Sequence, residues 1–166
     1  MEIISDRETV KQLQQHLNNW NPDEKCPSHE ERCAIYNTQG KLIKLHLCDQ
    51  RLKRIPSEVW KFSTLQSLDL SNNHLSILPQ ELSNLTTLQL LSLHNNQLNI
   101  LPQELWSLTA LQQLYLGLNQ LTSLPKEIGN LSFLTHLNLY NNQLTSLPKK
   151  IGNLSSLKYL DLSNNQ

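Results

Sequence analysis

The chain is poor in charged residues and in long apolar runs. Only 17% of its 166 residues are charged, and the acidic and basic residues balance at 14 each. Without an excess of positive charge there is no electrostatic basis for expecting nucleic acid or an anionic membrane surface as a partner. No apolar run approaches the roughly 18–20 residues that a transmembrane helix needs, so we expect no membrane insertion.

Targeting signals and cysteines are also scarce. The first residues, MEIISDRETV, have neither the basic n-region nor the apolar h-region of a secretory signal peptide, which favours a cytoplasmic location. The three cysteines, Cys26, Cys33 and Cys48, leave one thiol unpaired even if a disulfide forms. Cysteine usage therefore leaves the compartment open.

What the chain does contain is an internal repeat of 23 residues. The adjacent blocks 121–143 and 144–166 agree at 17 positions and differ at 6. Six units follow one another in phase, each starting at the first Leu of L-x-x-L-x-L-x-x-N-x-L, and they begin at Leu42, Leu65, Leu88, Leu111, Leu134 and Leu157. Positions 1, 4 and 6 are always Leu, position 9 is Asn in five units and Gln50 in the first, and position 15 is Pro in every complete unit.

This spacing predicts the local structure of one unit. The L-x-L at positions 4–6 alternates with period 2, so a short strand points both leucines inward and position 5 outward. The Asn at position 9 suits a turn, where its amide can bond the backbone of the coils before and after it. Pro at position 15 suits the first turn of a short helix or 3-10 segment, whose inward residues lie at positions 18 and 21. One unit cannot bury such a face alone, but stacked units form a continuous core.

The repeat pattern resembles the leucine-rich-repeat family over residues 42–166. The resemblance implies an α/β solenoid, a curved right-handed coil with a parallel sheet on the concave face and short helical or 3-10 segments on the convex face. We expect five complete 23-residue repeats and a truncated sixth in this domain. The chain stops in mid-repeat, so we expect either a fragment or a C-terminal edge that associates with another copy.

Residues 1–41 do not repeat and are expected to form an N-terminal cap. Ser5-Asp6-Arg7-Glu8 is a capping-box signature for a helix over about residues 6–19, and a hairpin with its turn at 37–40 would lead into the first repeat. The arrangement resembles the N-terminal cap of plant-type extracellular leucine-rich repeats. That resemblance implies a Cys26–Cys33 disulfide and an extracellular location, whereas the alternative is a pair of reduced thiols in a compact cap.

The differences between the two adjacent blocks point to a binding surface. Four of the six fall at positions 2, 3, 5 and 7, which face outward from the concave sheet, while most other exposed positions are unchanged. Tyrosines and histidines gather at these positions in the C-terminal half, and both types are favoured at binding surfaces. The candidate partner-binding residues are Leu90, His94, Tyr115, Leu118, His136, Asn138, Tyr140, Tyr159 and Asp161.

Catalytic and metal sites find little support in the sequence. Cys48 and His46 lie two residues apart on one predicted strand, but no third group or oxyanion donor accompanies them, and His46 is better explained by a surface ion pair with Asp69. No metal-ligand motif or phosphate-binding loop appears, so we expect no metal and no cofactor. Trp60 and Trp106 share position 19, where they either cap the convex core or form a minor contact.

The sequence therefore predicts a non-enzymatic module that binds a protein or peptide on the concave face of its solenoid. Two alternatives stay open. One is a ligand-binding ectodomain fragment of a receptor or immune-type sensor, and the other is a targeting or regulatory segment of a larger bacterial effector enzyme.

Overall fold

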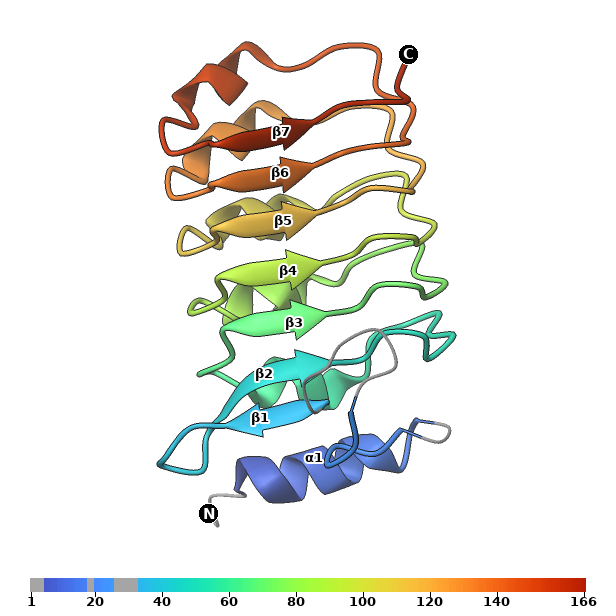
Figure 1. Ribbon diagram of the computed structural model, residues 1–166, viewed down its shortest axis with the longest axis vertical. Coiled ribbons are helices and arrows are strands. Elements are labelled where there is room, and N and C mark those ends of the chain that lie inside the picture. The colour runs from blue at the N-terminus through green and yellow to red at the C-terminus, as the bar shows by residue number, and fades with distance from the viewer. Residues whose placement is uncertain (1–4, 18–19, 26–32) are drawn as a thin grey trace.

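The computed structural model of the chain describes residues 5–17, 20–25 and 33–166. One sheet runs through the molecule in the strand order β1 to β7, and short helices lie behind it (Figure 1). The strands are β1 (Ala34–Tyr36), β2 (Leu42–His46), β3 (Ser67–Asp69), β4 (Leu90–Ser92), β5 (Gln113–Tyr115), β6 (His136–Asn138) and β7 (Tyr159–Asp161). The helices are α1 (Asp6–Gln14) and the 3-10 helices η1 (Ser57–Lys61), η2 (Gln80–Asn84), η3 (Gln103–Ser107), η4 (Lys126–Asn130) and η5 (Lys149–Asn153).

The register of the sheet follows the sequence repeat. From β2 to β7 all neighbouring strands are parallel, and Lys44, Ser67, Leu90, Gln113, His136 and Tyr159 lie side by side. Each step along the sheet therefore advances the chain by one 23-residue unit. The leucines at positions 1, 4 and 6 are fully buried in the inner units, for example Leu111, Leu114 and Leu116. The predicted α/β solenoid with an inward leucine core is confirmed.

The repeated proline starts each helical segment. Pro56, Pro79, Pro102, Pro125 and Pro148 lie at the N-caps of η1 to η5, one residue earlier than the first turn itself. In each case the proline carbonyl accepts a hydrogen bond from the N–H three residues later, as Pro125 does from Ile128 (3.2 Å). A missing N–H costs nothing at this position, because the first N–H groups of a helix have no intrahelical partner.

The repeated asparagine forms a hydrogen-bonded ladder between units. The Nδ2 group of buried Asn119 donates to the carbonyl oxygens of Leu93 and Leu116 (both 3.0 Å), and its Oδ1 accepts from the N–H of Leu98 (3.0 Å). The Leu116 oxygen in turn accepts from Asn142 in the next unit. Each asparagine thus bonds its own unit and the preceding one, and not both neighbours as the sequence suggested. Because one leucine oxygen accepts from two asparagines, these hydrogen bonds link each unit to the next.

The N-terminal elements close one end of the solenoid (Figure 1). α1 begins where the Ser5 side chain accepts a hydrogen bond from the Glu8 N–H (3.2 Å). The helix ends at Gln14, earlier than the sequence indicated, because the next residues bond three positions back rather than four. β1 pairs antiparallel with β2, and Gly40 adopts the positive φ of +73° that their hairpin turn requires. The Asp6 carboxylate accepts from the N–H of Leu42 (2.7 Å) and so joins α1 to the sheet.

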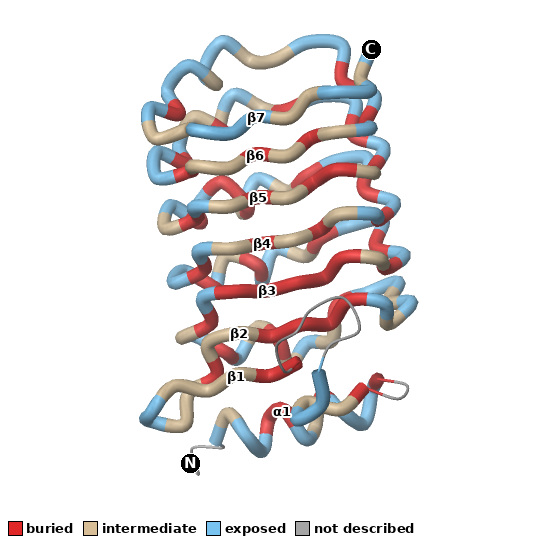
Figure 2. Tube along the Cα trace, in the orientation of Figure 1, coloured by how far each residue is buried: buried red, intermediate tan, exposed pale blue. Residues whose placement is uncertain are grey.

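At the other end, β7 pairs with β6 alone among the described strands. Leu160 is 39% exposed there, whereas the equivalent Leu137 of β6 is fully buried. Figure 2 shows this change along the molecule, from mostly buried residues at β2 and β3 to mostly exposed residues at β7.

We expect Asn119→Ala to destabilise the protein. The change leaves the buried Leu98 N–H without a partner and removes one donor from two leucine carbonyls, a loss of about 2–3 kcal/mol in the free energy of unfolding. Urea denaturation would measure it. Asn165→Ala is the matched control at the same repeat position, because this half-exposed side chain makes equivalent bonds that water can replace. Equal losses for the two variants would contradict the role of the buried ladder.

Candidate binding surface on the concave sheet

The strands present two rows of side chains away from the leucine core. In β4 to β7 the middle residue points inward, and the first and third residues lie on the opposite face. We call this outward side, together with repeat positions 7 and 8 after each strand, the sheet face. It comprises repeat positions 3, 5, 7 and 8, which hold the nine candidate partner-binding residues.

The N-terminal half of the sheet face is closed. Ser67, Asp69 and Ser71 of the second unit are all buried, as are His46 and Cys48 of the first. The His46–Asp69 pair exists, with Nδ1 and Oδ2 3.9 Å apart, but both side chains are buried, so the predicted surface ion pair is wrong in its location. The accessible side chains of the face therefore lie mainly on β4–β7 (Figure 2).

The nine predicted site residues all lie in this accessible part. Tyr159 is exposed, and the other eight are partly exposed. None of the three tyrosines belongs to the hydrophobic core or packs against it. The predicted site residues thus keep accessible surface on the sheet face.

His94 and Tyr140 stack across an intervening strand. Their ring centroids are 6.4 Å apart and their planes differ by 17°, although the two residues lie two units apart. Gly117 lies between them at the same repeat position. A Cβ atom on Gly117 would come within 2.6 Å of Asn138 Oδ1 and 3.0 Å of His94 Nδ1, so only glycine permits this close arrangement.

A second aromatic pair lies at the C-terminal end of the sheet face. The rings of His136 and Tyr159 stack with centroids 5.9 Å apart. The Tyr159 hydroxyl donates to Asp161 (3.3 Å), whose carboxylate also accepts from Asn138 Nδ2 (3.4 Å). Tyr115 bonds within its own strand, to Gln113 (2.9 Å). Four of the nine predicted residues are thus joined into one connected group around Asp161.

Leu118 occupies a backbone conformation that leucine rarely adopts. Position 8 is left-handed in all six units, and the other five residues there are Asp49, Asn72, Asn95, Asn141 and Asn164. Asn and Asp tolerate this conformation because their short polar side chains bond locally, whereas other residues are strained by roughly 1–2 kcal/mol. At φ +54°, Leu118 places an apolar side chain beside Gly117, where the other units have a residue that tolerates this backbone conformation. Strained residues of this kind gather at binding sites.

Two groups on the sheet face have protonation states set by their surroundings. Burial lowers the pKa of His94 below its ordinary value, and the negative charge of Asp69 offsets part of this effect. His94 is therefore neutral near pH 7. Hydrogen bonds from Ser163 lower the pKa of Asp161, so the carboxylate stays ionised, and its charge raises the pKa of the Tyr159 hydroxyl.

Sequence reasoning found the residues of this surface but missed how they pair. The signal was present in the fourth unit, residues 111–133, where Gly117 and Leu118 depart together from the pattern of the other repeats. Within the described ranges, no group of three His, Cys, Asp or Glu side chains could hold a metal ion. Nor does any described helix have the length and apolar character needed to cross a bilayer. Cys26 lies outside the described residues, so the Cys26–Cys33 disulfide stays a prediction.

Comparison with known proteins decides the family. The sequence profile described as Leucine rich repeat matches residues 40–98 and 109–166, which together make up most of the chain. The chain belongs to the leucine-rich-repeat family. Proteins with this repeat are typically interaction modules without enzymatic activity. No curated protein sequence matches the chain significantly.

Solved structures resemble the chain over most of its length. A leucine-rich-repeat protein of Leptospira interrogans is 42% identical, with a TM-score of 0.68 over 74% of this chain and 37% of that one. The ectodomain of the Arabidopsis thaliana membrane receptor kinase GASSHO1/SCHENGEN3, in complex with CASPARIAN STRIP INTEGRITY FACTOR 2, is 31% identical, with a TM-score of 0.75 over 95% of this chain and 21% of that one. A plant ice-binding protein is 27% identical, with a TM-score of 0.78 over 98% of this chain and 56% of that one. The chain thus spans less than two thirds of each.

We expect Leu118→Asn to stabilise the leucine-rich-repeat solenoid by about 1 kcal/mol, because Asn relieves the strain of the left-handed backbone. Thermal or urea unfolding would measure the gain. The reverse change at the equivalent position, Asn141→Leu, should lower stability by a similar amount, since the Asn141 side chain is exposed. A loss of stability in Leu118→Asn would show that the packing of the leucine side chain outweighs the strain of its backbone.

We expect the pKa of His94 to rise towards its ordinary value in Tyr140→Ala, because removing the stacked ring admits water to the imidazole. An NMR pH titration of the ring would follow it. In the native protein the lowered pKa makes stability fall as pH drops below the ordinary histidine value, since the unfolded chain then binds a proton that the folded chain does not. Phe133→Ala removes an exposed aromatic ring away from the sheet face and should leave the pKa unchanged.

Proposed function

We propose that the chain binds a protein or peptide on the sheet face of β4–β7, the concave side of its solenoid. The observation that carries the proposal is the gathering of partly exposed aromatic and apolar side chains at Leu90, Tyr115, Leu118 and the two stacked pairs. A sheet face that contacted only solvent would have no need of a leucine in a strained conformation beside this cluster. The face has few formal charges, with Asp161 ionised and His94 neutral, so it suits a partner that contributes apolar side chains and hydrogen bonds.

The relatives are consistent with this proposal. The GASSHO1/SCHENGEN3 ectodomain, which covers nearly all of this chain, is solved in complex with its partner. The proposal includes no catalytic step, because the buried His46 and Cys48 of the first unit are closed off from a substrate on the sheet face. It also includes association of two copies through β7, where Leu160 is exposed. Sedimentation would detect such a dimer, and Leu160→Lys should abolish it.

A receptor ectodomain fragment is the second candidate function, favoured by that same relative and by the predicted Cys26–Cys33 disulfide. Counting thiols in the unfolded, non-reduced protein separates the two readings. One reactive thiol would support an oxidised cap and an extracellular ectodomain, whereas three would support reduced cysteines and a cytoplasmic module.

We expect peptides selected from a random phage-displayed library on the native protein to lose binding when Tyr115, Tyr140 and Tyr159 are changed to Ala together. Truncating a central interface aromatic commonly costs more than about 1 kcal/mol, so the triple change should weaken binding at least tenfold. Fluorescence polarisation with the selected synthetic peptides would measure it.

Two controls accompany this measurement. Circular dichroism establishes that the triple variant is folded, and Phe133→Ala tests whether any exposed aromatic ring has the same effect. If the selected peptides bind the triple variant as tightly as the native chain, the sheet face is not the site.

A further inference from the structure

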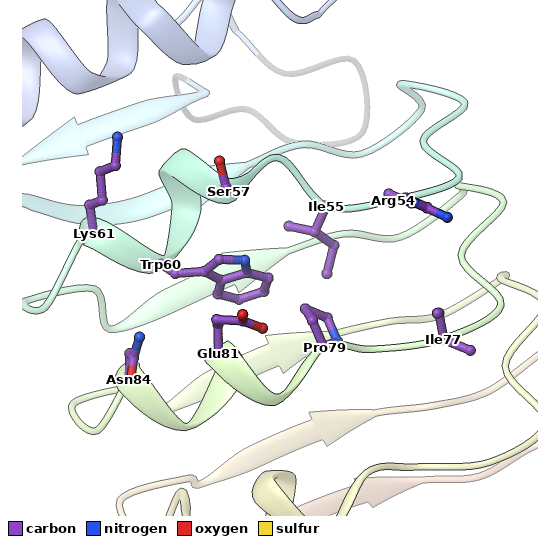
Figure 3. A pocket seen from close by; sticks show the side chains of 9 residues that line it. All are labelled: Arg54, Ile55, Ser57, Trp60, Lys61, Ile77, Pro79, Glu81 and Asn84. Atoms are coloured by element: carbon purple, nitrogen blue, oxygen red, sulfur yellow. The ribbon is translucent and has the colours of Figure 1, made fainter.

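A groove of about 630 Å³ lies on the side of the solenoid opposite the sheet, between the first and second units (Figure 3). Its walls come from η1 and η2 and from the segments that lead into them. Ligand clefts typically measure about 300–1,000 Å³. The groove is therefore large enough for a short stretch of peptide, and it shares no residue with the sheet face.

Trp60 forms the middle of the groove, and its counterpart in a later unit shows what is unusual about it. Trp60 and Trp106 occupy the same repeat position, yet Trp106 is 2% exposed in the core while Trp60 is only partly buried. In Figure 3 the Trp60 ring extends between Ile55 of its own unit and Pro79 of the next. The indole of Trp60 is thus accessible from the groove, whereas the indole of Trp106 at the equivalent position is buried.

The groove continues into an exposed apolar residue. Ile77 lines it and is 59% exposed, which is costly for an isoleucine unless something covers it. Later units have Ser123 and Ser146 at this repeat position. Only Ile100 is equivalent, at 68% exposed, and it lies outside the groove. Indole, isoleucine and proline surfaces together therefore form an apolar lining that is accessible from solvent.

Positive charge flanks this lining. Arg54 and Lys61 lie at opposite ends of the groove, with Trp60 between them (Figure 3). Neither forms an ion pair with a described residue, and residues 51–61 hold four of the chain's 14 Lys and Arg, whereas residues 62–125 hold none. Glu81 is the one acidic residue in the lining, which disfavours a polyanion such as nucleic acid. The charges instead complement one or two carboxylates.

We propose that this groove binds an acidic peptide segment of a partner protein, with an apolar side chain inserted between Trp60 and Pro79 and carboxylates directed to Arg54 and Lys61. The proposal is independent of the sheet-face function, since it depends on different residues in different units.

The test uses the 166-residue chain with Tyr115→Ala, Tyr140→Ala and Tyr159→Ala together as bait, so that the sheet face contributes little. We expect a random phage-displayed peptide library to yield sequences with an apolar residue beside Asp or Glu. Synthetic versions should bind about tenfold more weakly to Ile77→Ala and to the Arg54→Glu, Lys61→Glu double variant. Their affinity should also fall as salt is raised.

The chain supplies matched controls for both changes. Ile100→Ala removes the equivalent exposed isoleucine outside the groove, and Lys126→Glu with Lys149→Glu reverses two exposed charges in later units; both should leave binding unchanged within twofold. Trp60 is the one incompletely buried tryptophan of the three, so bound peptide should protect the protein's fluorescence from acrylamide, and Trp60→Phe should remove this effect.

Three results would overturn the proposal. The library could yield no enriched peptide, the enriched peptides could lack carboxylates, or their binding could survive the Ile77 and Arg54–Lys61 changes. Binding of a panel of neutral oligosaccharides that Trp60→Phe weakens, without peptide binding, would reassign the groove to sugars. None of these results bears on the sheet face, which is disabled in the bait and is tested separately on the native chain.

Discussion

The buried amide of the repeated asparagine is the interaction on which the rest of the structure depends. The turn after each strand leaves backbone groups inside the coil that have no strand partner. One side chain satisfies them by bonding the position-6 carbonyls of two successive units and an N–H of the earlier unit, as Asn96 and Asn119 do. Because each leucine oxygen is shared by two asparagines, the distance between coils is held at the spacing of a parallel sheet, roughly 4.8 Å.

That fixed spacing determines what the sheet face can do. Side chains in one row meet only their immediate neighbours unless a position is left empty. Gly117 is such a position, and His94 and Tyr140 close over it from the units on either side. The residue before position 9 is left-handed in every unit, so Leu118 presents its side chain only at the cost of strain. Two adjacent departures from the repeat therefore create the most distinctive part of the surface without disturbing the ladder beneath it.

The repeat made much of this structure predictable. Period and alternation determine strand register, the inward leucines and the helical start after proline, because each unit meets copies of itself in the same geometry. The sequence could not show that Asp69 and Ser71 are buried, because the same repeat positions carry accessible side chains in a later unit, such as Asn138 and Tyr140. Nor could it separate Trp60 from Trp106, which share a repeat position and differ in exposure. The stacking of His94 on Tyr140 depends on the lack of a side chain at Gly117, and the repeat pattern does not reveal such a contact.

The chain has no net charge, but its basic residues and its aromatic surface lie in different units. Basic residues gather in the first unit, beside the Trp60 groove, while the aromatic sheet face occupies the last four units and is nearly neutral. In a solenoid each unit contacts only its neighbours, so a change of stability or occupancy in one unit reaches a distant unit weakly. Changes at sites more than about 7–10 Å apart that share no contacts are generally additive. A partner in the groove and a partner on the sheet face would therefore bind with nearly independent affinities, and the solenoid would act by holding the two at a fixed separation rather than by transmitting a signal between them.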